Sequence, residues 1–442
     1  MATQKQGTVN GGSDFDVVLK EFYEGPIREH LNNKIPILQY VEKSKRKWSG
    51  RRILFPIHLR RNHGVGARGE SGKLPTAGRQ EYVESKINAK FMYGRIELTG
   101  VVIAASEGDK GAFASALRTE VEGLRRDLRV DMNRQVWGNP VASAGGGAAG
   151  NDTLSNNTSI LAQTSGNPAS TAAQAEVTVT FDNPGTRYLK AGMVLNFGAM
   201  TGTDQGPTAG AKRMQVVSVP TTTTAVLKNI NATGGAAVDI ADNDVCVLGD
   251  DVDNAFNKEI TGLSFMVSDS DDNFQTVDTG LNPEWKANVL DNGGDNRPLS
   301  LELMQLAIDT ADEVAGAEPN LVMGHHSIRR EYINLLTSDV RYAPEQLKGG
   351  FQKLTYAGGT TPMPLEFDRH APYNKLFFLN TNDIKLYVMK DWAFADRDGN
   401  SFSRMANSDS WEAFMCWYGN LGLERRFSQT VLSDITVDNL IF

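Results

Sequence analysis

The sequence has very little cysteine. Only Cys246 and Cys416 occur among its 442 residues, 170 positions apart. A disulfide-stapled framework and a thiolate metal cluster both need more cysteines, so the sequence excludes both. A chain so poor in cysteine fits assembly in a reducing cytoplasm.

The sequence also lacks a long apolar run. No stretch approaches the roughly 18 consecutive apolar residues that a membrane-spanning helix needs. Residues 1–16 do not join a basic segment to an apolar one, so we expect no signal peptide and a soluble intracellular product. Hydrophobic residues make up 40% and charged residues 22% of the chain, which is the composition of a globular protein. The net charge of −8 identifies no partner by itself.

A glycine-rich stretch imitates a nucleotide-binding motif. Gly64, Gly66 and Gly69 match the spacing G-x-G-x-x-G, but Pro75 and Gly78 follow where a helix would have to begin. Without a helix N-terminus there is no row of free N–H groups to hold a pyrophosphate. We therefore expect no dinucleotide site here.

Other catalytic and metal-binding patterns are missing as well. Residues 269–273 begin like a calcium loop, yet Phe274 stands in place of the turn glycine. His325 and His326 are neighbours, for which we expect a surface turn and no shared metal. No histidine has a recognisable orienting partner for general base catalysis. We expect neither an enzyme nor a cofactor.

The charges are distributed unevenly along the chain. Residues 43–79 contain eleven basic residues and one acid, whereas residues 242–295 contain thirteen acids and two bases. Both segments could be solvated faces. Alternatively, copies of the chain could meet with the basic segment on the acidic one. The basic tract could also contact nucleic acid without reading its sequence.

A long β-hairpin is predicted between residues 51 and 106. Strand-like runs at 51–59 and 81–106 flank a glycine-rich tip at 64–78. A two-stranded ribbon is marginal in water on its own, so it should lie on another surface. Nothing in the adjacent sequence obviously provides that surface.

The strongest local signal is an amphipathic helix between Asp109, a candidate cap, and Gly138, a candidate stop. Its apolar residues recur at steps of three or four and form one stripe: Phe113, Leu117, Val121, Leu124, Leu128, Met132 and Val136. The opposite face is charged, so we expect a long strut that lies on a sheet.

The rest of the chain changes character twice. Residues 139–175 are typical of a linker, and residues 176–248 predict short strands in a small barrel or sandwich inserted into the chain. From residue 297 onward, amphipathic helices alternate with strands, and residues 411–437 are strand-like.

This order of elements resembles the major capsid proteins of tailed bacteriophages, which have the Hong Kong 97-type fold. Residues 94–138 look like the second hairpin strand that leads into the spine helix of that family. Residues 319–336 look like the strand–turn–helix of its axial domain, and residues 411–437 like the closing strands of its peripheral domain.

The resemblance implies an α+β fold with the family's layout. The expected parts are an N-terminal arm (1–50), an extended loop (51–106), a spine helix (107–139), a linker and β-rich insertion (140–255), peripheral strands and a connection (256–296), an axial domain (297–400), and closing peripheral strands (401–442).

The resemblance also implies a function and partners. The chain would be a non-catalytic subunit of an icosahedral phage head, assembled from pentamers and hexamers in the host cytoplasm. Its partners would be itself, a scaffolding protein, a portal protein, in some members a decoration protein, and packaged DNA contacted without sequence preference. No membrane is involved.

Charge alone selects candidate contacts between subunits. On the hairpin they are Arg60, Arg61, Arg68, Lys73 and Arg79. Their candidate acidic partners on a neighbouring copy are Asp250, Asp251, Asp253, Asp269, Asp271 and Asp272. The alternatives are a bacterial nanocompartment shell (encapsulin) with the same fold, an enzyme that binds phosphate at the glycine-rich loop, and a phage tail or adhesion protein.

Overall fold

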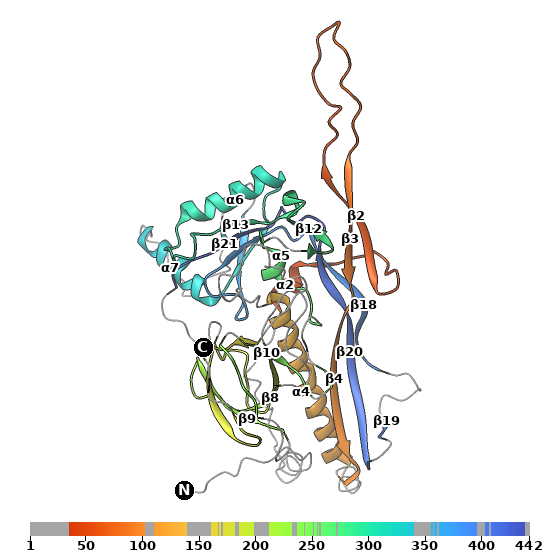
Figure 1. The fold of residues 1–442 in the computed structure, drawn as a ribbon, viewed down its shortest axis with the longest axis vertical. Helices are drawn as coiled ribbons and strands as arrows, with labels where there is room; N and C mark the ends of the chain where they lie inside the picture. Colours follow the sequence, from red (N-terminus) through yellow and green to blue (C-terminus); the bar gives the residue numbers. More distant parts are fainter. Residues whose placement is uncertain are drawn as a thin grey trace. The chain divides into compact units, whose positions relative to one another are not determined.

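A computed structural model describes most of the chain (Figure 1). The described residues are 35–101, 110–138, 161–166, 168, 171–181, 185–198, 212–231, 237–242, 244–250, 252–253, 255, 258–270, 273–339, 355–356, 358–359, 362–395, 403–405 and 408–437, without the side chains of 110–119, 163, 337–339 and 355. No helix in these ranges is long and apolar enough to cross a membrane.

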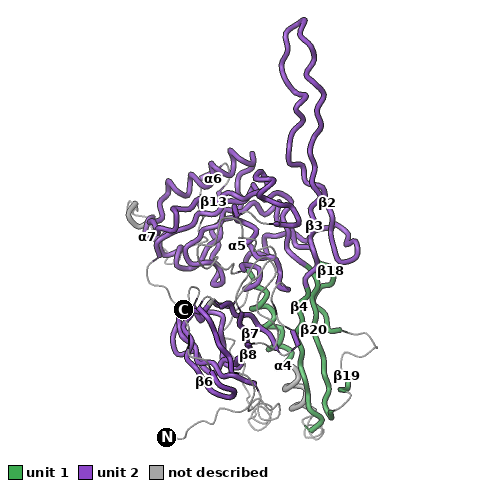
Figure 2. Tube along the Cα trace, viewed as in Figure 1, with its two compact units in different colours: residues 1–35, 91–133, 388–419 green, residues 36–90, 134–387, 420–442 purple. Residues whose placement is uncertain are grey.

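The described residues divide into two compact units (Figure 2). Unit 1 comprises Phe91–Asn133 and Val388–Gly419. Unit 2 comprises Pro36–Lys90, Arg134–Tyr387 and Asn420–Phe442, as far as these residues are described.

Unit 1 holds a sheet of long strands and most of one long helix. Its elements are β4 (Lys90–Thr99), β18 (Ile384–Phe394), β19 (Ser403–Arg404), β20 (Ser410–Leu423) and α4 (Lys110–Trp137). One end of each of β4, β18, β20 and α4 belongs to unit 2. Strand β20 pairs with β18, β19 and β4. Alternate residues of β4 are buried, as expected for a strand with one covered face.

Helix α4 confirms the predicted strut. It spans 28 residues, which is about 42 Å at 1.5 Å per residue. Leu128, Met132 and Val136 of the predicted stripe are buried, and Glu122, Arg125 and Arg129 on the opposite face are exposed. The candidate cap Asp109 lies outside the described residues, as do the side chains of Phe113 and Leu117.

The helix ends where the sequence predicted. Gly138 has φ +67°, in the left-handed region that favours glycine, and its N–H donates to the carbonyl of Arg134 at 2.9 Å.

The hairpin in unit 2 is shorter than the expected 51–106. Strands β2 (Arg52–Arg60) and β3 (Glu81–Asn88) pair with each other in an antiparallel ribbon, and β4 joins the sheet of unit 1 instead. In that sheet β4 pairs with β20, and its Met92, Ile96 and Leu98 are buried.

The hairpin was predicted to lie on another surface, and its base does so. Ile53, Phe55 and Ile87 are buried. The N–H of Lys86 donates to the carbonyl of Gln275 at 2.9 Å, and the Arg46 guanidinium lies 5.0 Å from the Phe55 ring centre. The base of the hairpin is therefore fixed by its own chain.

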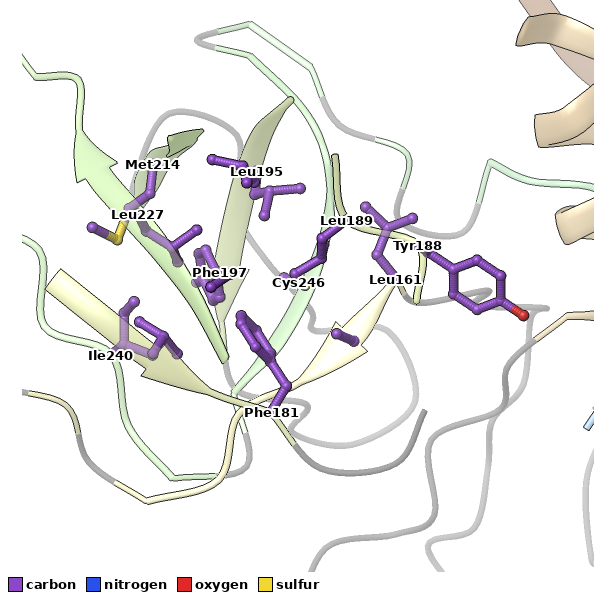
Figure 3. Packing of buried hydrophobic residues seen from close by; sticks show 14 of the residues in the cluster. Leu161, Phe181, Tyr188, Leu189, Leu195, Phe197, Met214, Leu227, Ile240 and Cys246 are labelled. Atoms are coloured by element: carbon purple, nitrogen blue, oxygen red, sulfur yellow. The ribbon is translucent and has the colours of Figure 1, made fainter. Parts of the chain in front are cut away.

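The predicted β insertion is a small antiparallel barrel. Its strands are β5 (Ala162–Gln163), β6 (Glu176–Thr180), β7 (Val194–Gly198), β8 (Arg213–Ser218), β9 (Thr224–Asn229) and β10 (Val245–Leu248). They follow the order β5-β10-β7-β8-β9-β6, and a bridge between Thr164 and Phe181 closes the circle. Phe181, Leu195 and Phe197 belong to a core cluster of its own (Figure 3).

Unit 2 contains a mixed sheet covered by two helices, which we call the axial sheet because most of it falls in the expected axial range. Its strands are β13 (Asn288–Leu290), β14 (Leu321–Gly324), β15 (Thr355–Tyr356), β16 (Met363–Phe367), β17 (Leu376–Leu379) and β21 (Thr430–Leu432), in the order β13-β21-β17-β14-β16-β15. The helices α6 (Leu301–Ala315) and α7 (His326–Asp339) share one core cluster with these strands. The sheet thus includes β13 and β21 from outside the expected axial range 297–400.

Helix α6 is capped at both ends. At its start, the Ser300 hydroxyl accepts the N–H of Leu303 at 3.2 Å. At its end, Gly316 has φ +60°, and its N–H donates to the backbone carbonyl of Asp312 at 2.7 Å.

Short elements complete unit 2. They are α2 (Pro36–Tyr40), β1 (Glu42–Lys43), α5 (Leu263–Met266), β11 (Asn273–Phe274), β12 (Val277–Asp278) and the 3₁₀ turn η1 (Pro283–Trp285). The Tyr40 hydroxyl donates to Glu366 on β16 at 2.6 Å, which ties the start of the described chain to the axial sheet.

Gly94 should be intolerant of a side chain, because it lies where α4 packs on β4. A Cβ there would lie 2.7 Å from Cδ1 of Leu124 and 2.8 Å from Cδ1 of Leu128. We expect Gly94→Ala to lower the free energy of unfolding by about 1–3 kcal/mol through overpacking. Urea unfolding of the purified chain measures this change.

Gly123→Ala on α4 is the matched control. Nothing lies within 4 Å of its Cβ position, so the substitution should raise stability by up to about 1 kcal/mol through helix propensity. Equal effects of the two substitutions would contradict the packing argument.

Candidate functional site

The hairpin cations are the candidate site, and the structure separates them into two groups. Arg60 is bound within its own chain, with its guanidinium 3.1 Å from a carboxylate oxygen of Glu284 and 3.1 Å from one of Glu81. The hydrogen bond to Glu284 is the main cause of its raised pKa. Arg60 therefore orients the strand ends of the hairpin.

Arg68 also bonds to its own chain. Its Nε donates to the carbonyl of Lys73 at 3.2 Å and its Nη1 to the carbonyl of Ala67 at 2.9 Å. Together with the bond from the N–H of Gly72 to the carbonyl of Gly69, these contacts shape the tip as a preformed turn.

Arg61, Lys73 and Arg79 remain available for a partner. All three are exposed, and within the described ranges none lies within ion-pair distance of a carboxylate. Apolar side chains accompany them, since Leu74 is 88% and Val65 69% exposed. The tip thus exposes cations and apolar side chains together, a combination that is typical of a contact surface.

The glycine motif is part of this tip. Gly64 donates its N–H to Oδ1 of Asn62 at 2.7 Å, and residues 61–80 of the described chain contain no helix. The stretch therefore lacks the helix N-terminus that a pyrophosphate site requires.

The candidate acids are partly occupied in their own chain. Oδ1 of Asp250 accepts the N–H groups of Val252 and Asp253, both at 2.8 Å, and Asp253 forms an ion pair with Lys258. Asp269 is exposed and acts electrostatically on Lys375. Asp251, Asp271 and Asp272 lie outside the described residues.

No ion pair joins a hairpin cation to these acids in the part of the chain that the structure describes. Their pairing across two copies therefore stays a prediction from charge.

Sequence reasoning missed a buried junction within unit 2. The ring of Tyr188, from the barrel, stacks on His370 at 5.6 Å between centroids, and its hydroxyl donates to the His370 carbonyl at 3.2 Å. The neighbouring Arg187 lies 4.5 Å from the ring centre of Tyr373 and donates to the carbonyl of Ala371 at 3.2 Å. No local pattern in the sequence connects residues 187–188 with 370–373, because 182 positions separate Tyr188 from His370.

The expected surface turn at His325 was wrong. His325 is buried, its Nδ1 lies 2.8 Å from the Ser327 hydroxyl, and its ring meets Tyr373 edge-on at 4.7 Å. Burial lowers the pKa of His325 to about 3 and that of His370 to about 2, and Arg187 near both opposes protonation further. Tyr373 packs against the His325 ring, and Tyr188 packs against the His370 ring.

Across the described residues, no group of three or more His, Cys, Asp or Glu side chains could hold a metal ion.

Comparison with known proteins gives structural matches alone. No protein-family model matches the chain, and no curated protein matches its sequence. The cyanophage A-1(L) capsid matches with a TM-score of 0.52 at 11% identity, over 93% of this chain and 95% of that chain.

Two further solved structures match with lower TM-scores. The capsid of a native GTA particle has a TM-score of 0.48 at 7% identity, over 94% of this chain and 95% of its own. Mycobacterium phage Bobi has a TM-score of 0.43 at 8% identity, over 95% and 97%.

The likeness to the cyanophage capsid shows the fold. The chain has the Hong Kong 97-type capsid fold, and the α+β class predicted from the sequence is confirmed.

Acid should destabilise the chain through His370. The folded chain keeps this imidazole neutral down to about pH 2, whereas the unfolded chain protonates it near its ordinary pKa of 6.5. The unfolded state therefore binds the extra proton, and stability falls as the pH drops below about 6.5. The expected loss is at most about 1.4 kcal/mol per pH unit for this group.

Urea unfolding of the unassembled chain at several pH values between about 7 and 4.5 measures this slope. His370→Gln should lose stability less steeply than the wild type. Equal slopes for the two proteins would contradict the assignment.

Proposed function

We propose that this chain is the major capsid protein of a tailed double-stranded DNA bacteriophage. It assembles with copies of itself, as pentamers and hexamers, into the icosahedral head that encloses the genome. The observation that carries the proposal is the shared fold, which extends over 93% of the chain. A likeness of that extent leaves little of the chain for another architecture.

The hairpin gives this proposal a physical basis. Its base is buried in its own chain, whereas its tip exposes Arg61, Lys73 and Arg79 beside Leu74. A preformed tip with charge and apolar surface suits contact with a neighbouring copy, and charge complementarity selects which neighbour is accepted. The candidate acids of the neighbour remain those around Asp250 and Asp269.

The proposal includes the remaining partners and the location. A scaffolding protein and a portal protein take part in assembly in the host cytoplasm, and the mature subunit resides in the virion. Packaged DNA contacts the shell without sequence preference, since only clustered cations are needed. The role is structural and not catalytic.

An encapsulin-like nanocompartment shell is the second candidate, because it would share the fold. The inserted barrel favours the phage head, since the nanocompartment shell is expected without an insertion of this size. An enzyme that binds phosphate at Gly64–Gly69 is disfavoured, because that loop forms the hairpin tip.

Negative-stain electron microscopy with light scattering on the same sample tests the function. We expect closed shells or five- and six-fold rings, from the chain alone or with its scaffolding protein co-expressed. Monomers under both conditions would contradict the proposal. Shells that contain a cargo enzyme and no DNA would favour the nanocompartment.

Charge reversal at the hairpin tip tests the proposed contact. Lys73→Glu with Arg79→Glu should reduce assembled material by about tenfold or more, because like charges then face the neighbour's acids. Light scattering measures assembly, and circular dichroism checks that the subunit stays folded. Lys190→Glu with Lys228→Glu on the barrel is the control with the same charge change, and normal assembly of the tip variant would contradict the contact.

A further inference from the structure

Helix α6 presents an acidic face to solvent. The segment 299–328 contains five acids and no lysine or arginine. Glu302, Asp309 and Glu313 are exposed, and at about 100° per residue they lie within roughly 40° of one another around the helix. They therefore form one acidic ridge along α6.

An apolar row flanks this ridge. Leu306 is 48% exposed and Val314 is 54% exposed, one turn on either side of Thr310. The Thr310 hydroxyl donates to the carbonyl of Leu306 at 2.7 Å, so this polar group is satisfied within the helix. The buried side of α6 is already filled by Met304, Ala307, Ile308 and Ala311, so the exposed row is additional to the core.

The acids of the ridge are not neutralised in their own chain. Within the described ranges, Glu302, Asp309 and Glu313 form no ion pair. Asp309 accepts one neutral hydrogen bond, from Nε2 of Gln305 at 2.7 Å. A line of like charges beside apolar side chains is self-repelling unless a cationic partner covers it.

The same part of unit 2 carries two adjacent arginines near the start of α7. Arg329 is exposed on α7 and Arg330 beside it is half-buried. Both helices contribute to one core cluster, through Met304 and Ile308 on α6 and Ile328 and Tyr332 on α7, so their positions are fixed together. Figure 1 shows them at separate places on the periphery of the axial sheet.

We propose that the acidic ridge of α6 in one copy contacts Arg329 and Arg330 on α7 of a second copy. This inference rests on the proposed function, since it requires the chain to assemble with itself. The charges also set the symmetry of the contact. Two copies related by a two-fold axis through α6 would place acid against acid, whereas α6 against α7 places opposite charges together.

A contact between two different patches of the same chain is head-to-tail. Such a contact repeats from copy to copy and closes into a ring when the rotation fits. A ring of five or six copies closed by the α6–α7 contact would be one capsomer of the proposed head. Several exposed charge pairs acting together are needed, because a single exposed pair contributes little.

Charge reversal on each helix, alone and combined, tests the contact. The α6 variant is Asp309→Lys with Glu313→Lys, and the α7 variant is Arg329→Glu with Arg330→Glu. Each should lower the yield of shells or rings by about tenfold under the conditions where the wild type assembles. The four substitutions combined should restore the yield to within about threefold of the wild type, because the pairs are complementary again.

Glu176→Lys with Asp239→Lys on the barrel is the matched control, since both acids are exposed and the charge change equals that of the α6 variant. It should assemble as the wild type does. Circular dichroism and thermal unfolding of each variant separate lost assembly from lost folding.

Each outcome decides the proposal. Normal assembly of the folded α6 variant overturns it, and so does a combined variant that stays as defective as the single ones. Rescue of the α6 variant by Lys73→Glu with Arg79→Glu, instead of by the α7 change, would assign the ridge to the hairpin tip and also overturn it. Failure of the wild type to assemble at all would refute the proposed function itself.

Discussion

A buried ion pair at the end of the long helix organises the centre of unit 2. Arg134 and Glu259 are both almost fully buried, with 3.2 Å between Nη1 and Oε2. The adjacent Gln135 accepts the N–H of Ile260, and Asn420 accepts that of Thr261. Removing two charges from water is costly, so such a pair is stable only when its hydrogen bonds are complete. The end of α4, the segment 259–261 and β20 are consequently held in one arrangement.

Close backbone packing reinforces this arrangement. A Cβ at Gly262 would lie 2.7 Å from Cα of Gly138, so the close approach of these two backbones requires glycine. Trp137 is fully buried there, and its ring packs edge-on against Phe377 of β17 with 5.5 Å between the ring centroids. The last turn of α4 is therefore anchored in the core of unit 2.

Elements with a local pattern could be predicted, and those defined by distant pairing could not. The stripe of α4 and the stop at Gly138 are visible in sequence because helix contacts recur every three or four residues. The axial sheet takes β21 from the far end of the chain, where nothing local indicates which strand it will join. Charged segments are visible in the sequence too, but the partner of each charge is not. Arg60 and Asp253 were candidates for contacts between subunits, yet both form ion pairs inside their own chain.

The barrel has one more consequence. Its first strand, β5, pairs directly with its last, β10, with Ala162 opposite Cys246. Cα atoms paired across antiparallel strands lie only about 5 Å apart, so the two ends of the barrel adjoin. Its contacts with the rest of unit 2 include those of Arg187 and Tyr188 with residues 370–373. A core of its own and adjoining ends are the features of a domain inserted into a chain. A different folded domain with neighbouring termini could occupy the same position, which makes this point of the chain a natural place to display foreign sequence.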